Sequence, residues 1–149
     1  MASFSTISFA NLEYLSKYKS IDKVDFLRDI KTISKDISKT LGDKKITVIF
    51  VSNEYIKKLN KDFRKKNEST DVLSFNLEED NNEVYVSPSY IYRTYRKESF
   101  GIEIMRVIIH GILHIYGYDH KGKFLERENN MEEMFKIQEN ILNNVVKNN

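Results

Sequence analysis

The sequence predicts an α+β domain, in which a small mixed β-sheet of about four strands packs against about five helices. Short β-branched segments alternate with segments whose apolar residues recur at helical spacing. The most apolar of the helical segments also carries histidines, so we expect the metal-site helix to be central and buried. The chain has 149 residues, of which 40% are hydrophobic and 31% charged, and this favours a single domain over residues 1–149.

The N-terminal third predicts one strand and one long helix. Residues 3–9 (SFSTISF) alternate apolar and polar side chains, which is typical of a strand. Residues 24–41 place apolar side chains at helical spacing, and Gly42 follows as a stop signal. The expected apolar positions of this helix are Val24, Leu27, Ile30, Ile33, Ile37 and Leu41.

The next segment predicts a buried strand followed by a short basic helix. Residues 46–52 (ITVIFVS) are β-branched and apolar, and Asn53 is a suitable N-cap for the helix that follows. The lysines of that helix should face outward. The side chains expected to face inward are Tyr55, Ile56, Leu59 and Phe63.

Residues 71–87 predict a β-hairpin. DVLSFNLE (71–78) and EVYVS (83–87) are strand-like, with Asn81 and Asn82 as the turn between them. Pro88 suits the first turn of a helix that could continue to Lys97.

Two more helices complete the prediction. Ser99 is the expected cap of a helix from about 100 to 116, which is apolar almost all round and should be buried. The last helix spans about 123 to 146. The side chains expected to face the core from it are Leu125, Met134, Phe135, Ile141, Leu142 and Val145.

Composition excludes several kinds of protein. The chain has no cysteine, which excludes disulfides, thiolate metal ligands and a cysteine nucleophile. The first residues lack a basic segment followed by an apolar one, and no apolar run is long enough for a membrane span. We therefore expect a soluble, cytoplasmic protein with no membrane partner.

The three histidines lie together in the run HGILHIYGYDH, as His110, His114 and His120. On a helix the first two are one turn apart and point the same way, and Gly117 allows the chain to turn back with the third. Three imidazoles leave a fourth coordination position for water, which is typical of a catalytic zinc site. The alternative is a chance cluster of histidines on a core helix.

The same spacing occurs in the zinc-peptidase pattern H-E-x-x-H-x-x-G-x-x-H, but the second position here is Gly111. The missing glutamate is the general base of those peptidases, so a peptidase mechanism is disfavoured. Zinc lowers the pKa of bound water to about 7 without a dedicated base. A metal-dependent hydrolase with another substrate is therefore favoured.

Positive charge points to a phosphate-containing substrate. The run at residues 57–66 (KKLNKDFRKK) carries six basic residues and one acid, and could face a polyanion. Within it, Arg64 is the candidate to bind a reacting phosphate, because guanidinium forms a bidentate fork with phosphate oxygens. The alternative is a solvated helix with an exposed arginine. Asp119 could orient a metal ligand or cap the nearby turn.

Two motifs resemble those of the YbeY family of bacterial metal-dependent endoribonucleases. The run from His110 to His120 matches the family pattern H-G-x-L-H-x-x-G-Y-D-H. Residues 59–64 and 70–75 match L-N-x-x-[YF]-R and T-D-V-L-S-F. The sequence departs from the pattern in the flanks of this second motif and at the start of the following strand, at Ser69, Asn76, Asn82, Glu83 and Val84.

The resemblance implies one zinc ion held by His110, His114 and His120, although imidazole ligands also accept nickel, cobalt, copper and iron. It implies cleavage of single-stranded RNA in the processing of ribosomal RNA and the quality control of ribosomes, with ribosomal RNA and the small subunit as partners. It also implies that Arg64 lines the active-site groove. Two alternatives stay open: a metal-dependent peptidase-like hydrolase, and a non-catalytic zinc-binding module associated with the ribosome.

Overall fold

The computed structural model describes residues 6–78, 80–118 and 124–147. Five α-helices and a four-stranded sheet confirm the predicted α+β class for these residues. The elements in chain order are β1 (Thr6–Ala10), the 3₁₀ helix η1 (Leu12–Leu15), α1 (Lys23–Leu41), β2 (Lys45–Phe50), α2 (Asn53–Arg64), β3 (Val72–Glu78), β4 (Asn81–Val86), α3 (Pro88–Thr94), the 3₁₀ helix η2 (Lys97–Ser99), α4 (Phe100–Ile115) and α5 (Phe124–Lys147).

The sheet is mixed and has the strand order β1-β2-β4-β3. The β1–β2 and β2–β4 pairs are parallel, whereas β3 and β4 form the predicted antiparallel hairpin. Strand β3 is therefore an edge strand, and one side of its backbone is not paired within the sheet. The candidate site lies beside this free edge.

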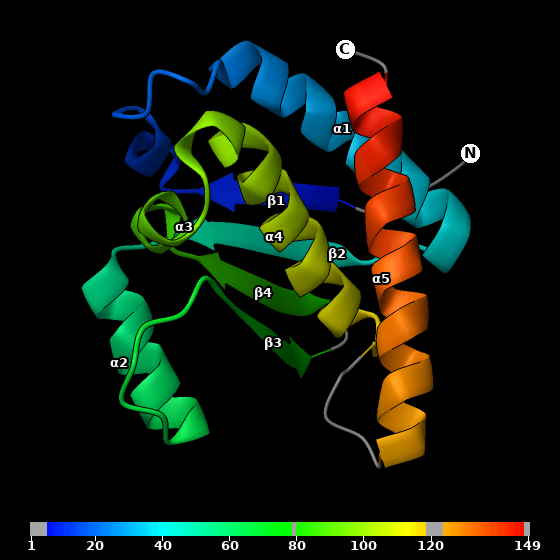
Figure 1. Cartoon of the computed structure of the whole chain (residues 1–149). Coiled ribbons are helices and arrows are strands. Elements are labelled where there is room, and N and C mark those ends of the chain that lie inside the picture. The colour runs from blue at the N-terminus through cyan, green and yellow to red at the C-terminus, as the bar shows by residue number, and fades with distance from the viewer. Residues whose placement is uncertain (1–5, 79, 119–123, 148–149) are drawn as a thin grey trace.

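The main core fills one face of the sheet. Figure 1 shows α4 lying across the strands, with α5 beside it and α1 at the β1 side. The apolar side chains of α4 are buried on most of its circumference, as the sequence predicts. Among the described helices, none is both long and apolar enough to cross a membrane.

The opposite face of the sheet carries a smaller cluster under α2. Ile56 and Leu73 are buried there, and Leu59, Phe75 and Tyr85 pack against them. This cluster fixes the helix against β3 and β4, so the basic segment is held near the free edge of the sheet.

Some local predictions are wrong. Ser52, not Asn53, caps α2 through its Oγ, which accepts a hydrogen bond from the Tyr55 backbone N–H at 3.1 Å. Ser99 is the N-cap residue of α4 as predicted, but its side chain makes no capping hydrogen bond. Asn81 and Asn82 belong to β4 rather than to a turn, because they pair with Glu78 and Asn76 of β3. The Asn82 side chain also bonds the Lys45 carbonyl at the start of β2.

Three predicted core aromatics face solvent instead. Tyr55, Phe63 and Phe135 are 47%, 65% and 61% exposed. Helical spacing places these residues near the apolar face of their helices. However, Ile56 of α2 and Met134 of α5 already fill the space next to the sheet and next to α4. Val24 and Leu27 of α1 are exposed as well, whereas Ile30 is buried as predicted. The side chain of Leu125 lies outside the described residues.

Gly111 marks the closest approach of α4 to the sheet. A Cβ atom there would lie 2.6 Å from Val84 Cγ1, 2.9 Å from Val72 Cγ2 and 3.2 Å from Ser74 Oγ. The Ser74 hydroxyl donates a hydrogen bond of 2.7 Å to the Gly111 carbonyl. The helix therefore sits so close to β3 and β4 that no side chain fits between them.

The Gly111→Ala substitution should lower the free energy of unfolding by about 1 kcal/mol or more, because overpacking against two β-branched side chains outweighs the gain in helix propensity. Gly101→Ala is the matched control on the same helix, since a Cβ there would meet nothing within 4 Å. It should raise stability by up to about 1 kcal/mol. Urea unfolding of both variants checks the pair, and equal effects would contradict the close approach.

Candidate active site

The last turns of α4 bring two imidazoles together. The Nε2 atoms of His110 and His114 are 3.1 Å apart, and the two rings are nearly perpendicular, at 86°. Both side chains are half-buried. Helical spacing places them on one face, one turn apart, as the sequence predicts.

Each imidazole is oriented through its other nitrogen. His114 Nδ1 lies 2.8 Å from the backbone carbonyl of Tyr118, which can only accept, so Nδ1 is the donor. His110 Nδ1 lies 2.9 Å from Gln138 Oε1. The Gln138 amide nitrogen donates to Glu139 at 3.0 Å, so Oε1 accepts from His110. In the neutral rings both Nε2 atoms then carry lone pairs.

These two lone pairs face each other, an arrangement that a bound cation stabilises. Two nitrogen ligands of a tetrahedral zinc ion lie about 3.3 Å apart, given the usual zinc–nitrogen bond length. Donation of Nδ1–H to a carbonyl oxygen is also the usual support of a metal-binding imidazole. The separation and the outer hydrogen bonds of His110 and His114 thus fit a metal.

The chain turns back after α4 as expected. Gly117 adopts a positive φ of 98°, and the Tyr118 backbone N–H bonds the Leu113 carbonyl at 3.1 Å. Asp119 and His120 lie outside the described residues. Within the described part of the chain, no three histidine, aspartate or glutamate side chains gather as a metal site. The role of His120 stays a prediction.

The histidine pair opens into a cleft of about 540 Å³ along the free edge of β3. His110 and His114 line it from α4, and Phe63 and Arg64 line it from the end of α2. The described structure therefore brings Arg64 into the same cleft as two of the predicted ligands, although 46 residues separate Arg64 from His110 in sequence. This arrangement combines candidate metal ligands with a guanidinium group.

Asn60 holds the end of α2 and the following loop together. Its side chain is 2% exposed, its amide donates to the Glu68 carbonyl at 2.8 Å, and its backbone carbonyl accepts from the Lys66 N–H at 3.2 Å. Along the chain, Arg64 lies between Asn60 and these two anchored residues. Asn60 is part of the family motif, but sequence alone did not reveal this positioning role.

An ion-pair network supports Gln138. Arg106 of α4 bonds both Glu103 and Glu139, and Glu139 neighbours Gln138 on α5. Burial raises the pKa of Glu139, but the hydrogen bonds from Arg106 and Gln138 outweigh it and hold that pKa below its usual range. Sequence reasoning missed Gln138, because 28 residues separate it from His110.

Another network forms a wall of the cleft. Tyr95 Oη donates to Asp71 Oδ2 at 3.0 Å, and Thr70 Oγ1 donates to Asp71 Oδ1 at 3.3 Å. Burial, together with the charge of Asp71 and the hydrogen bond to it, raises the pKa of Tyr95 to about 12. Thr70 and Asp71 belong to the T-D-V-L-S-F motif, so part of that motif shapes the cleft.

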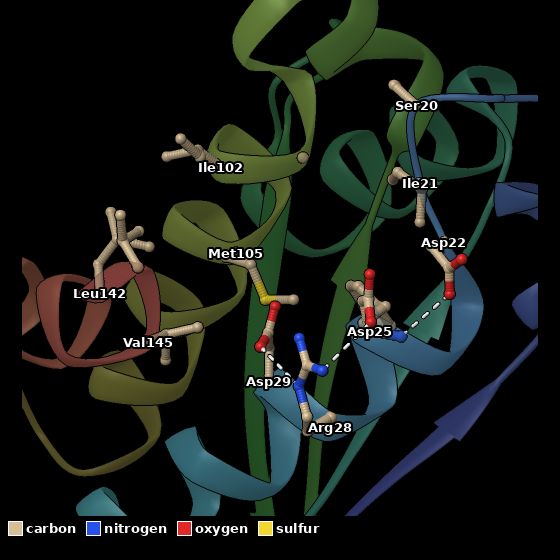
Figure 2. A pocket seen from close by; sticks show the side chains of 13 residues that line it. Ser20, Ile21, Asp22, Asp25, Arg28, Asp29, Ile102, Met105, Leu142 and Val145 are labelled. Atoms are coloured by element: carbon tan, nitrogen blue, oxygen red, sulfur yellow. Dashed lines mark hydrogen bonds and ion pairs between the residues drawn. The ribbon is translucent and has the colours of Figure 1, made fainter. Parts of the chain in front are cut away.

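A second cavity, of about 550 Å³, lies between the starts of α1 and α4 and the end of α5. Figure 2 shows that its charged groups engage one another. Asp22 caps α1 by accepting from the Val24 and Asp25 backbone N–H groups, and Arg28 pairs with Asp25 at 3.3 Å and Asp29 at 3.9 Å. None of the described histidines lines it, so the cleft beside β3 is the better candidate for chemistry.

Comparisons with known proteins identify the family of the chain. A family model described as Endoribonuclease YbeY matches residues 11–146. An Endoribonuclease YbeY of Thermotoga petrophila is 38% identical over 126 residues, covering 81% of each chain. One from Borreliella afzelii is 39% identical over 117 residues, covering 69% of this chain and 74% of the relative. The solution structure of TM1509 from Thermotoga maritima superposes with a TM-score of 0.59 at 33% identity, covering 94% of this chain and 89% of that one.

The fold and the cleft define an α+β domain with a histidine pair and an arginine beside the free edge of its sheet. The family match spans more than half of the chain, and the relatives cover most of it. This chain belongs to the YbeY family, which confirms the resemblance seen in the two motifs.

The raised pKa of Tyr95 predicts a loss of stability in alkali. The folded state holds the phenol proton more tightly than the unfolded chain, whose pKa is near 10.0. This contribution is fully present below pH 10 and is lost as the pH rises towards 12. Between these values, the unfolding free energy of Tyr95→Phe should fall less steeply with pH than that of the wild type.

Asp71→Asn provides the companion variant, because it keeps the phenol but removes the neighbouring charge. Tyrosinate absorbance in the folded protein should then appear at lower pH than in the wild type. An unchanged titration would show that Asp71 does not act on Tyr95.

Proposed function

We propose that this chain is a metal-dependent endoribonuclease that cleaves single-stranded RNA. In this proposal His110, His114 and His120 hold one zinc ion, and Arg64 binds the phosphate of the substrate. The observation that carries it is the shared cleft, in which His110, His114 and Arg64 meet beside the free edge of β3. The relatives named Endoribonuclease YbeY support the choice of RNA.

Each group of the cleft has a definite task in this reaction. Zinc, when bound, supplies Lewis-acid activation of water or of a phosphate oxygen. The Arg64 guanidinium orients the phosphate and offsets negative charge that develops on it. Gln138 and the Tyr118 carbonyl hold the two imidazoles with their Nε2 atoms turned towards each other.

The outer face of α2 provides a path for the RNA backbone. Its lysines are exposed and follow one another into the loop after the helix: Lys57, Lys58, Lys61, Lys65 and Lys66. They can neutralise phosphates on both sides of the cleavage point, so binding should weaken steeply as salt rises.

A peptidase-like reaction is the weaker alternative, and Gly111 is the reason. Peptidases with this histidine spacing place a glutamate base next to the first histidine. At Gly111 even a Cβ atom would lie 2.6 Å from Val84, so that position cannot carry the base. A non-catalytic zinc module is disfavoured as well, because three histidine ligands leave one coordination position open.

We further propose that the substrate is ribosomal RNA, in the context of the small ribosomal subunit and of RNA processing in the cytoplasm. A cleft open along a sheet edge can admit a single strand at the surface of a large RNA assembly. The place of this activity in ribosome quality control belongs to the same proposal.

Purified zinc-loaded protein should cleave a single-stranded ribosomal RNA fragment, and His114→Ala should abolish this cleavage. Arg64→Ala should lower the cleavage rate about a hundredfold or more, because the charge of the reacting phosphate loses its partner. Arg28→Ala is the matched control, since Arg28 lies in the second cavity with Asp25 and Asp29. Gel analysis of end-labelled RNA gives the rates.

Parallel purification of His114→Ala distinguishes this activity from a contaminating nuclease. Cleavage that persists in metal-free His114→Ala would contradict the proposal. Peptide hydrolysis that survives Arg64→Ala would support the peptidase-like alternative instead.

Gln138→Leu should weaken zinc binding by about 10- to 100-fold, because His110 Nδ1 loses its acceptor and the ring its orientation. Gln138→Glu keeps an acceptor oxygen and should restore most of the affinity. Competition with a chromophoric chelator measures both variants without any RNA. Equal affinity in wild type and Gln138→Leu would show that His110 does not hold the metal in this orientation.

A further inference from the structure

Aromatic side chains form a continuous row from the cleft across the outer face of the sheet. The ring centroids of Phe63 and Phe75 are 5.2 Å apart, those of Phe75 and Tyr85 5.7 Å, and those of Tyr85 and Tyr55 6.4 Å. Phe75 and Tyr85 pack on the cluster under α2. The row is thus anchored in the fold at its centre and reaches the surface at both ends.

Phe63 is the end of the row that lies in the cleft. It is 65% exposed, although Phe75 and a buried cluster lie directly behind it. Ile56 and Leu59 pack α2 against the sheet, and Phe63 is not part of that cluster. The edge-on contact with Phe75, at 68°, holds the ring while much of its surface stays open.

The neighbours of Phe63 indicate what the exposed ring could bind. Arg64 lines the same cleft, and exposed Lys61, Lys65 and Lys66 surround the end of the helix. An apolar ring among cations suits a ligand that is anionic on one side and flat and aromatic on the other. A nucleotide of a single strand has both properties, with its phosphate and its unstacked base.

We propose that Phe63 is a base-stacking platform, on which a nucleobase of the single-stranded RNA stacks while Arg64 binds a phosphate of the same strand. This inference rests on the proposed function and adds a residue that sets its selectivity. Bases inside a duplex are already stacked on one another and cannot occupy the ring. Phe63 therefore favours single strands over duplexes, whereas the lysines bind either.

The test compares binding of three probes to zinc-loaded protein, and gel analysis after each measurement checks that the probe is intact. The probes are a 2′-O-methyl RNA strand of about eight nucleotides, a strand of equal length without bases, and a duplex of the same sequence. The variants are Phe63→Leu, which keeps an apolar side chain, and Phe63→Tyr, which keeps a ring. Phe135→Leu is the matched control, because Phe135 is similarly exposed, at 61%, and does not line the cleft.

Phe63→Leu should weaken binding of the base-containing strand about fivefold or more, and leave binding of the abasic strand within about twofold of wild type. Phe63→Tyr and Phe135→Leu should bind both strands like the wild type. Preference for the single strand over the duplex should fall in Phe63→Leu only. The salt dependence should stay unchanged in all variants, because no phosphate contact is removed.

Phe63→Trp gives a direct readout of stacking, since the chain contains no other tryptophan. Its fluorescence should be quenched by the base-containing strand and not by the abasic strand. In Phe135→Trp neither strand should quench.

Two results separate the inference from the proposed function. If wild type binds none of the three probes, the proposed function fails and the platform with it. If wild type binds RNA, but Phe63→Leu binds the base-containing strand equally well, the platform is wrong and the proposed function stands. Quenching of Phe63→Trp by a peptide and not by RNA would assign the ring to a protein partner and overturn the platform.

Discussion

The contact between Gly111 and the sheet sets the geometry on which the candidate site depends. Because Gly111 faces Val72 and Val84, the rotation of α4 about its axis is fixed. His110 and His114 then lie about 100° and 60° around the helix from that contact, on the same side, given 3.6 residues per turn. This direction takes both imidazoles to the free edge of β3, where the cleft opens. The absence of a side chain at Gly111 thus determines the direction of the His110 and His114 side chains.

The rest of the fold keeps this arrangement rigid. Helix α5 supports His110 through Gln138, and the turn at Gly117 supports His114 through the Tyr118 carbonyl. On the far side of the cleft, Asn60 holds the segment that carries Arg64. Side chains of α2, β3 and α4 therefore meet in one cleft. Such preorganisation is what a site needs when it must bind and orient charged groups.

Sequence reasoning succeeded where local pattern determines structure. The apolar periodicity predicted α4, and the four-residue spacing placed His110 beside His114. It failed where tertiary packing chooses between equivalent apolar positions, as for Phe63 and Phe135, which helical spacing assigned to the core although the space is filled by other side chains. Gln138 had no local signal at all. At Gly111 the sequence shows only that the glutamate base of the peptidases is absent. The packing role of this glycine depends on strands that are far away in the sequence.

X-ray absorption spectroscopy of the zinc-loaded protein shows whether α4 and the turn after it hold a metal with one coordination position left open. We expect a first coordination shell of three imidazole nitrogens and one light atom that a competing anion replaces. One imidazole should disappear from the shell in each of His110→Ala, His114→Ala and His120→Ala. A shell with fewer than three imidazoles, or one closed by four protein ligands, would contradict this arrangement.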